Sequence, residues 1–112
     1  MAERYRVLWS PVALDDLESM IEFFVEEAGL QQAVSLQEKI ESRVAALASH
    51  PKRCRIVPEL KALGVTTYRE LILPPYRIFF RMDDDVVGIT AVLDGRRDLD
   101  ELVLLRGLVL DD

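Results

Sequence analysis

The stretch Tyr68–Leu99 most constrains the fold, because it contains three apolar runs separated by two turn signals. Pro74-Pro75 separates the first two runs, and Asp83-Asp84-Asp85 separates the last two. The runs are rich in the β-branched and aromatic residues that favour strands, which are expected at about Thr67–Leu73, Tyr76–Met82 and Val86–Leu93. Such short links let consecutive strands pair directly, so the stretch predicts an antiparallel sheet.

The turn at Pro74-Pro75 also predicts a strand register. If Leu73 and Tyr76 close a two-residue turn, Tyr68 lies opposite Arg81, and Ile72 lies opposite Arg77. Side chains alternate along a strand, so Arg77 and Arg81, four residues apart, share one face of the sheet.

The first half of the chain predicts a strand and a helical hairpin. Tyr5–Trp9 is a short β-prone run, and Ser10-Pro11 pairs an N-cap with proline at the first helical position. Gly29 ends this helix, and a second is expected over about Gln31–Ala48, antiparallel to the first because the link is short. The apolar faces follow three- and four-residue steps, with Leu14, Leu17, Met20, Ile21, Phe24 and Ala28 in the first helix and Ala33, Leu36, Ile40, Val44 and Leu47 in the second.

The predicted order is therefore β-α-α-β-β-β, followed by an apolar tail or short helix at Leu99–Leu110. This order is typical of an α+β fold with an N-terminal strand and an antiparallel two-helix hairpin packed on a small, mainly antiparallel sheet. A length of 112 residues corresponds to a single domain, residues 1–112, with one core.

The charge of the chain is uneven. Residues 1–49 carry a net charge of −5, residues 50–82 carry +5 and residues 83–112 carry −6, for a total of −6. The total argues against strong nonspecific binding of nucleic acid, which requires many neutralised phosphates, whereas the basic middle leaves room for a local anionic partner. No apolar run approaches the roughly 20 residues of a membrane-spanning helix. With no apolar signal core and a single cysteine, the chain is expected to be cytoplasmic.

The sequence offers little for conventional catalysis or metal binding. His50 and Cys54 are the only histidine and cysteine, and they lack the further ligands of a usual metal site. No Gly-rich phosphate loop occurs. We expect no metal and no cofactor, with His50 at a helix end and Cys54 a passive small side chain.

The basic side chains are the candidate partner-binding residues. An arginine fork binds carboxylate or phosphate with two parallel hydrogen bonds, so these side chains suit an acidic peptide or a phosphate backbone. An alternative remains open, in which Arg77 and Arg97 pair internally with Glu59, Glu70 or Asp98 and brace the fold. The candidates are Lys52, Arg53, Arg55, Arg69, Arg77, Arg81, Arg96 and Arg97.

Five short motifs, in order over nearly the whole chain, resemble the RelE/ParE superfamily of toxins from bacterial type II toxin–antitoxin modules. They are Ala13-Leu14-Asp15-Asp16-Leu17, Val57-Pro58-Glu59-Leu60, Tyr68-Arg69-Glu70-Leu71, Pro75-Tyr76-Arg77-Ile78-Phe79-Phe80 and Asp94-Gly95-Arg96-Arg97-Asp98-Leu99. The resemblance implies a helical hairpin on a mainly antiparallel sheet, which agrees with the pattern of the residues.

The superfamily contains ribosome-dependent endoribonucleases of the RelE type, which cleave messenger RNA on the ribosome. By resemblance, Arg77 and Arg97 occupy two arginine positions of that site, and Arg69 lies near a position that carries lysines. However, no tyrosine or histidine follows Tyr76, and Asp94 stands where many relatives have histidine. Because cleavage needs both a base and an acid, these differences count against an enzyme.

The resemblance therefore favours the ParE-like branch, whose members inhibit DNA gyrase by binding. In either branch a cognate antitoxin neutralises the toxin through a disordered, often acidic segment that folds along it. We expect a toxin–antitoxin hetero-oligomer, with the basic middle section and the apolar tail as contact surfaces. The alternatives are a RelE-like endoribonuclease and a non-toxic relative that acts only as a binding partner.

Overall fold

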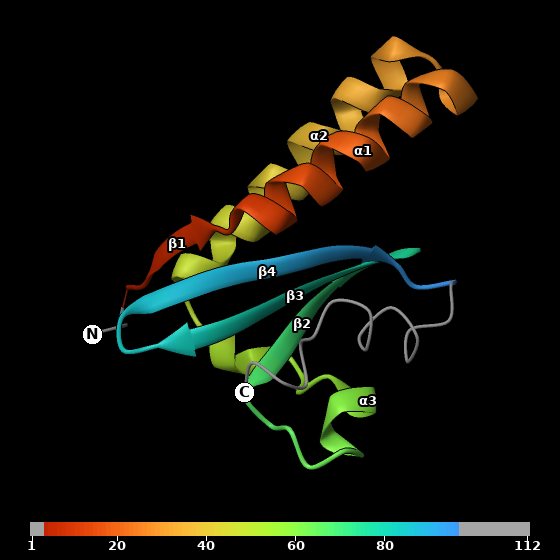
Figure 1. The fold of residues 1–112 in the computed structure, drawn as a ribbon. Coiled ribbons are helices and arrows are strands. Elements are labelled where there is room, and N and C mark those ends of the chain that lie inside the picture. Colours follow the sequence, from red (N-terminus) through yellow and green to blue (C-terminus); the bar gives the residue numbers. More distant parts are fainter. Residues whose placement is uncertain (1–3, 97–112) are drawn as a thin grey trace.

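A helical hairpin packs on one face of a four-stranded sheet in the computed structural model of the protein, which describes residues 4–96 (Figure 1). Two 3-10 turns, Ala46–Ala48 and Pro51–Arg53, and a short helix connect the hairpin to the sheet. The helices and strands are β1 (Arg6–Trp9), α1 (Pro11–Ala28), α2 (Leu30–Ala45), α3 (Pro58–Lys61), β2 (Tyr68–Leu73), β3 (Tyr76–Asp83) and β4 (Val86–Asp94). Among residues 4–96, no helix has the length and apolarity needed to cross a membrane.

The sheet confirms the predicted α+β class. Its strand order is β1-β4-β3-β2, with β1 parallel to β4 and the other neighbours antiparallel. The predicted register is also confirmed, because Tyr68 pairs with Arg81 and Ile72 pairs with Arg77. The register between β3 and β4 shifts once, at Phe79/Phe80.

Local signals explain where the hairpin begins and turns. The Ser10 hydroxyl accepts a hydrogen bond from the Ala13 amide at 3.1 Å, and Pro11 opens α1, so this terminus is capped as the sequence predicted. Gly29 ends α1 with φ of 93°, a conformation that glycine adopts without steric cost. The second helix is shorter than predicted, because its α-helical part ends at Ala45 and a 3-10 turn follows.

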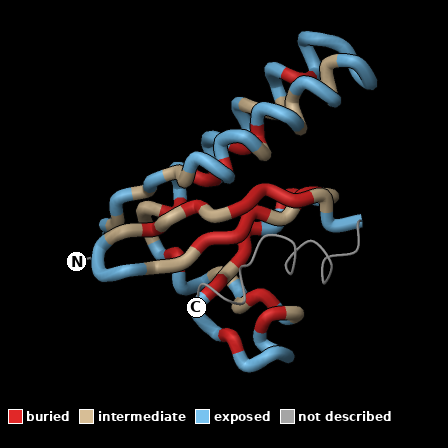
Figure 2. The backbone as a smooth tube through the Cα atoms, viewed as in Figure 1, coloured by how far each residue is buried: buried red, intermediate tan, exposed pale blue. Residues whose placement is uncertain are grey.

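The predicted apolar face of α1 was partly wrong. Leu14 and Ala28 are exposed, and Ala13 is fully buried instead. Adjacent helical residues point about 100° apart, so the burial of Ala13 and Leu17 turns Leu14 away from the sheet. Ala28 lies at the far end of the hairpin, which projects beyond the sheet and is mostly exposed there (Figure 2). The predicted face of the second helix is confirmed, with Leu36 half-buried and the other positions buried, although Leu47 lies in the 3-10 turn that follows α2.

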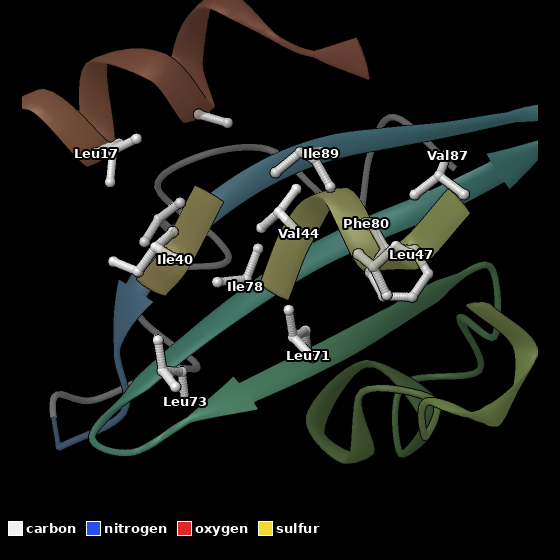
Figure 3. Packing of buried hydrophobic residues seen from close by; sticks show 12 residues of the cluster. Leu17, Ile40, Val44, Leu47, Leu71, Leu73, Ile78, Phe80, Val87 and Ile89 are labelled. Atoms are coloured by element: carbon white, nitrogen blue, oxygen red, sulfur yellow. The ribbon is translucent and has the colours of Figure 1, made fainter. Parts of the chain in front are cut away.

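The main core lies between the hairpin and the sheet (Figure 3). The base of the hairpin contributes Ala13, Leu17, Ile40, Val44 and Leu47, and the sheet contributes Leu71, Leu73, Ile78, Phe80, Val87, Ile89 and Val92. A second cluster covers the opposite face of the sheet, where residues around α3 pack against β2, β3 and β4. Its members are Val57, Leu60, Val65, Tyr68, Phe79, Ala91 and Leu93.

A side-chain carboxylate extends the contact between α1 and the sheet. Strand β1 pairs with β4 only as far as Ile89, although β4 continues to Asp94. Beyond that point, the Val92 amide donates a hydrogen bond of 2.9 Å to the Asp16 carboxylate of α1. Asp16 thus satisfies a backbone group of β4 and fixes the helix beside the strand.

We predict that Asp16→Ala lowers the free energy of unfolding by about 1.5 to 3 kcal/mol, because it removes a charge-assisted hydrogen bond to a strand amide. Urea denaturation of the purified protein measures the change. Asp15→Ala removes the neighbouring, exposed carboxylate and is the matched control, expected to change stability by less than about 0.5 kcal/mol. Equal effects of the two substitutions would contradict this role of Asp16.

Candidate partner-binding surfaces

Arg77 is the centre of an ion-pair network on the sheet face opposite the hairpin. Its Nη1 and Nη2 atoms each donate a hydrogen bond of 2.8 Å to the Glu59 carboxylate. Its Nε donates to Glu70 at 2.5 Å, and its Nη2 also donates to Glu70 at 2.8 Å. The Glu70 side chain is 0% exposed and that of Arg77 is 11% exposed, so these groups depend on one another rather than on water.

Arg55 completes this network, because its Nε donates a 2.7 Å hydrogen bond to Glu70. Glu59 lies on α3, Glu70 on β2 and Arg77 on β3, so the network joins the short helix to two strands. The sequence left open whether Arg77 binds a partner or pairs within the chain. In the structure, Arg77 pairs within the chain, with Glu59 and Glu70. Arg97 and Asp98 lie outside the described residues.

The network also affects the protonation states of Glu59 and Arg77. Hydrogen bonds from Arg77 hold the pKa of Glu59 below its usual value, and hydrogen bonds from Glu59 and Glu70 raise the pKa of Arg77. Glu59 is therefore a carboxylate and Arg77 a cation at neutral pH.

The remaining predicted cations do not gather on one surface. Arg69 precedes Glu70 on β2, so its side chain points to the sheet face opposite that of Arg77, and its Nη1 donates to the Cys54 carbonyl at 2.6 Å. Arg81 lies 5.6 Å from the centre of the Tyr68 ring and 3.2 Å from the Asp83 carboxylate. Arg96 donates to Asp94 from Nε at 3.0 Å and from Nη2 at 2.7 Å.

Lys52 and Arg53 are exposed and belong to a small basic hollow of about 310 Å3, which Tyr5, His50 and Pro51 also line. His50 is exposed and has a left-handed backbone, with φ of 57°. Cys54 is half-buried, and this burial raises its thiol pKa, which fits the predicted passive role. Within residues 4–96, no group of three or more His, Cys, Asp or Glu residues is placed to hold a metal ion.

A larger groove, which sequence analysis missed, lies between α1 and the end of the sheet that carries the β2–β3 turn. It encloses about 710 Å3, and we call it the α1 groove. Burial raises the pKa of the Tyr76 phenol in its wall, so this group stays neutral. The apolar side chains that line the groove include Met20, Phe23 and Phe24 of α1, Pro75 of the β2–β3 turn, and Tyr76 and Leu93 of the sheet. The adjacent Phe23-Phe24 pair on α1 is the sequence signal that was available, because a single helix face cannot bury both rings.

We predict that Arg77→Met destabilises the protein by about 3 to 5 kcal/mol, because it leaves the buried Glu70 with only the half-exposed Arg55 as a partner. Guanidinium denaturation followed by circular dichroism measures the loss. Arg96→Met, which breaks an exposed pair within one turn, is the control and should leave the unfolding midpoint unchanged. A stable Arg77→Met protein would show that the network is dispensable.

We also predict that the stabilisation from Glu59 depends on pH. Because its pKa in the folded protein lies below the ordinary 4.5, its contribution is complete above about pH 4.5 and is lost as the pH falls through the folded pKa. The stability difference between the wild type and Glu59→Gln should therefore shrink on acidification, as measured by denaturation at several pH values. Glu38→Gln, which removes an exposed carboxylate of α2, is the control for the loss of a surface charge. A constant difference for Glu59→Gln would refute the linkage.

The comparison with known families confirms the resemblance seen in the sequence. The sequence model of one protein family, described as the ParE toxin of type II toxin–antitoxin system, parDE, matches residues 7–99, which is most of the chain. The fold is similar to a chain of the chromosomal ParDE TA system from P. aeruginosa, with a TM-score of 0.67 and 21% identity, covering 80% of this chain and 94% of that chain. No curated protein matches the sequence. This chain belongs to the ParE toxin family of type II toxin–antitoxin systems.

Proposed function

We propose that this protein inhibits growth by binding DNA gyrase, without cleaving RNA, and that a cognate antitoxin neutralises it in the bacterial cytoplasm. Membership of the ParE toxin family supports a role as the toxin of a type II toxin–antitoxin system. One observation favours binding over RNA cleavage. Arg69 and Arg77, two of the arginines that a ribonuclease would need, already donate hydrogen bonds to groups of the same chain.

Arg77 has little capacity left for a phosphate. A guanidinium has five N–H groups, and four hydrogen bonds from Arg77 already go to Glu59 and Glu70. A phosphate that accepted two hydrogen bonds from Arg77 would have to displace one of these carboxylates. Displacing Glu70 would leave a buried charge with only the half-exposed Arg55 as its partner, which is costly. Arg69, the second cation of the ribonuclease alternative, lies on the opposite face of the sheet. The third, Arg97, lies outside the described residues.

Within the part of the chain that the structure describes, no suitable acid lies beside Arg77. Cleavage of a phosphodiester needs a base for the 2′-hydroxyl and an acid for the leaving oxygen. Arg77 holds Glu59 as a carboxylate of low pKa, so Glu59 is a poor proton donor at neutral pH. His50 lies in the separate basic hollow, beside Tyr5 and Lys52.

We further propose that, of the predicted partner-binding cations, Lys52 and Arg53 contact acidic groups of the gyrase target. Both are exposed, and neither has an ion pair with another described residue. In contrast, Arg55, Arg77 and Arg81 bind side chains of the same chain. Charges at the rim of an interface mainly affect the rate of association, so this contact should weaken with salt.

Induced expression without antitoxin tests the proposal. We expect growth arrest with loss of plasmid supercoiling and intact transcripts, and inhibition of purified gyrase by the purified protein. The double variant Lys52→Glu/Arg53→Glu should inhibit gyrase about tenfold less well, whereas Lys39→Glu, at an exposed site on α2, should behave as the wild type.

The alternatives give different results in the same cells. Cleaved transcripts with normal plasmid topology would establish the ribonuclease reading instead. Normal growth with a folded product would establish a non-toxic relative that acts only as a binding partner. Equal inhibition by the double variant and the wild type would exclude the basic hollow from the gyrase contact.

A further inference from the structure

Two further cations lie beside the loop that carries Lys52 and Arg53. Arg69 of β2 donates hydrogen bonds from Nη1 to the backbone carbonyls of Lys52 at 3.3 Å and of Cys54 at 2.6 Å. Arg43 is exposed in the last turn of α2. Burial raises the pKa of the Cys54 thiol, and the charges of Arg69 and Arg43 act in the opposite direction, so both guanidinium groups lie near this thiol. Cations from α2, a 3-10 turn and β2 therefore meet here, and we call them the Cys54 cation cluster: Arg43, Lys52, Arg53 and Arg69.

The Cys54 cation cluster has no acidic partner among residues 4–96, because none of its four side chains forms an ion pair with a described residue. The charge of Glu70 also reaches the thiol, but the Glu70 carboxylate pairs with Arg55 and Arg77. Like charges repel one another, so their gathering here opposes folding unless an anion neutralises it. Five other arginines do have an acidic partner, namely Arg6, Arg55, Arg77, Arg81 and Arg96.

From this arrangement we infer that the contact with gyrase extends from Lys52 and Arg53 across Arg43 and Arg69, and that it receives a segment of gyrase with several neighbouring aspartate or glutamate residues. This inference rests on the proposed function, because it specifies the chemistry of the gyrase segment. A single carboxylate could neutralise one or two of the four cations, whereas a run of carboxylates matches the whole cluster. The guanidinium of Arg43 suits such a partner, since an arginine fork binds a carboxylate with two parallel hydrogen bonds.

A nucleic acid fits the surroundings of the cluster less well. Binding of a nucleic acid depends on the neutralisation of many phosphates, and the cluster supplies only four cations. The adjoining hairpin belongs to residues 1–49, which carry a net charge of −5, and it projects beyond the sheet. An extended phosphate backbone that passed the cluster along the hairpin would be repelled, whereas a short acidic segment can end before it.

Alkylation of Cys54 tests the inference on the full-length protein, since this is the only cysteine of the chain. Iodoacetamide is uncharged, so the rate of its reaction with the thiol reports whether a partner covers the cluster. We expect saturating purified gyrase to slow the alkylation of Cys54 several-fold, as measured by mass spectrometry. A synthetic peptide of alternating aspartate and serine should also slow the reaction, and added salt should remove this protection. A peptide of alternating lysine and serine should give no protection.

Substitutions at Arg43 separate binding from folding. Arg43→Gln should weaken the affinity for gyrase about fivefold and reduce its dependence on salt, because it removes one charge from the contact. The unfolding midpoint should stay unchanged, because Arg43 is exposed and has no ion pair with a residue in the range 4–96 to lose. Arg43→Lys keeps the charge and should bind nearly as the wild type does. Lys61→Gln, which removes an exposed cation of α3, is the matched control and should bind as the wild type does.

Three results would overturn the inference: equal rates of Cys54 alkylation with and without bound gyrase, unchanged gyrase affinity of Arg43→Gln, and better protection by duplex DNA than by the aspartate peptide. The last result would assign the cluster to nucleic acid. Inhibition of gyrase is scored separately, so a protein that inhibits gyrase but gives one of these results loses only this inference. A protein that neither binds nor inhibits gyrase loses the proposed function and the gyrase contact together, and the peptides then decide whether the cluster takes an acidic segment.

Discussion

The buried carboxylate of Glu70 is the constraint on which much of this structure depends. A charged group without exposure is strongly destabilising unless it is paired and hydrogen-bonded, and Arg55 and Arg77 supply both. Arg77 also donates hydrogen bonds from Nη1 and Nη2 to Glu59, which lies on α3. The arginine that pairs with Glu70 therefore also fixes the position of α3. The apolar cover of this face, Val57, Leu60 and Val65, follows from that placement.

This use of the arginines has a consequence for function. A guanidinium that stabilises a buried carboxylate is not available to stabilise the charge that develops on a cleaved phosphate, since both roles need the same N–H groups. A member of the ParE toxin family that binds its target can therefore keep arginine on this face as a structural residue. Among residues 4–96, exposed groups without this structural role lie elsewhere, for example Lys52 and Arg53 at the basic hollow and Phe23 at the α1 groove.

The two surfaces have opposite character because the fold separates the charges of the chain. The hairpin carries the acidic first section and projects beyond the sheet, which leaves Phe23 exposed beside the β2–β3 turn. Asp16 holds α1 at β4 through the Val92 amide and so defines one side of the groove. Lys52 and Arg53 lie in a connection between the hairpin and the sheet, away from α1. The arrangement separates an acidic surface from a basic one on a small domain.

The order of the elements, the α+β class and the family could be predicted from the sequence, because they depend on local patterns. The turn at Pro74-Pro75 sets the pairing of Ile72 with Arg77, and the cap at Ser10 starts α1. The partners of Arg77, the exposure of Leu14 and the concavity beside Phe23 follow instead from the packing of the folded chain. Each of these features depends on contacts between residues far apart in the chain, such as Asp16 with Val92. A local sequence pattern shows which side chains are present, but it does not show which of them come into contact.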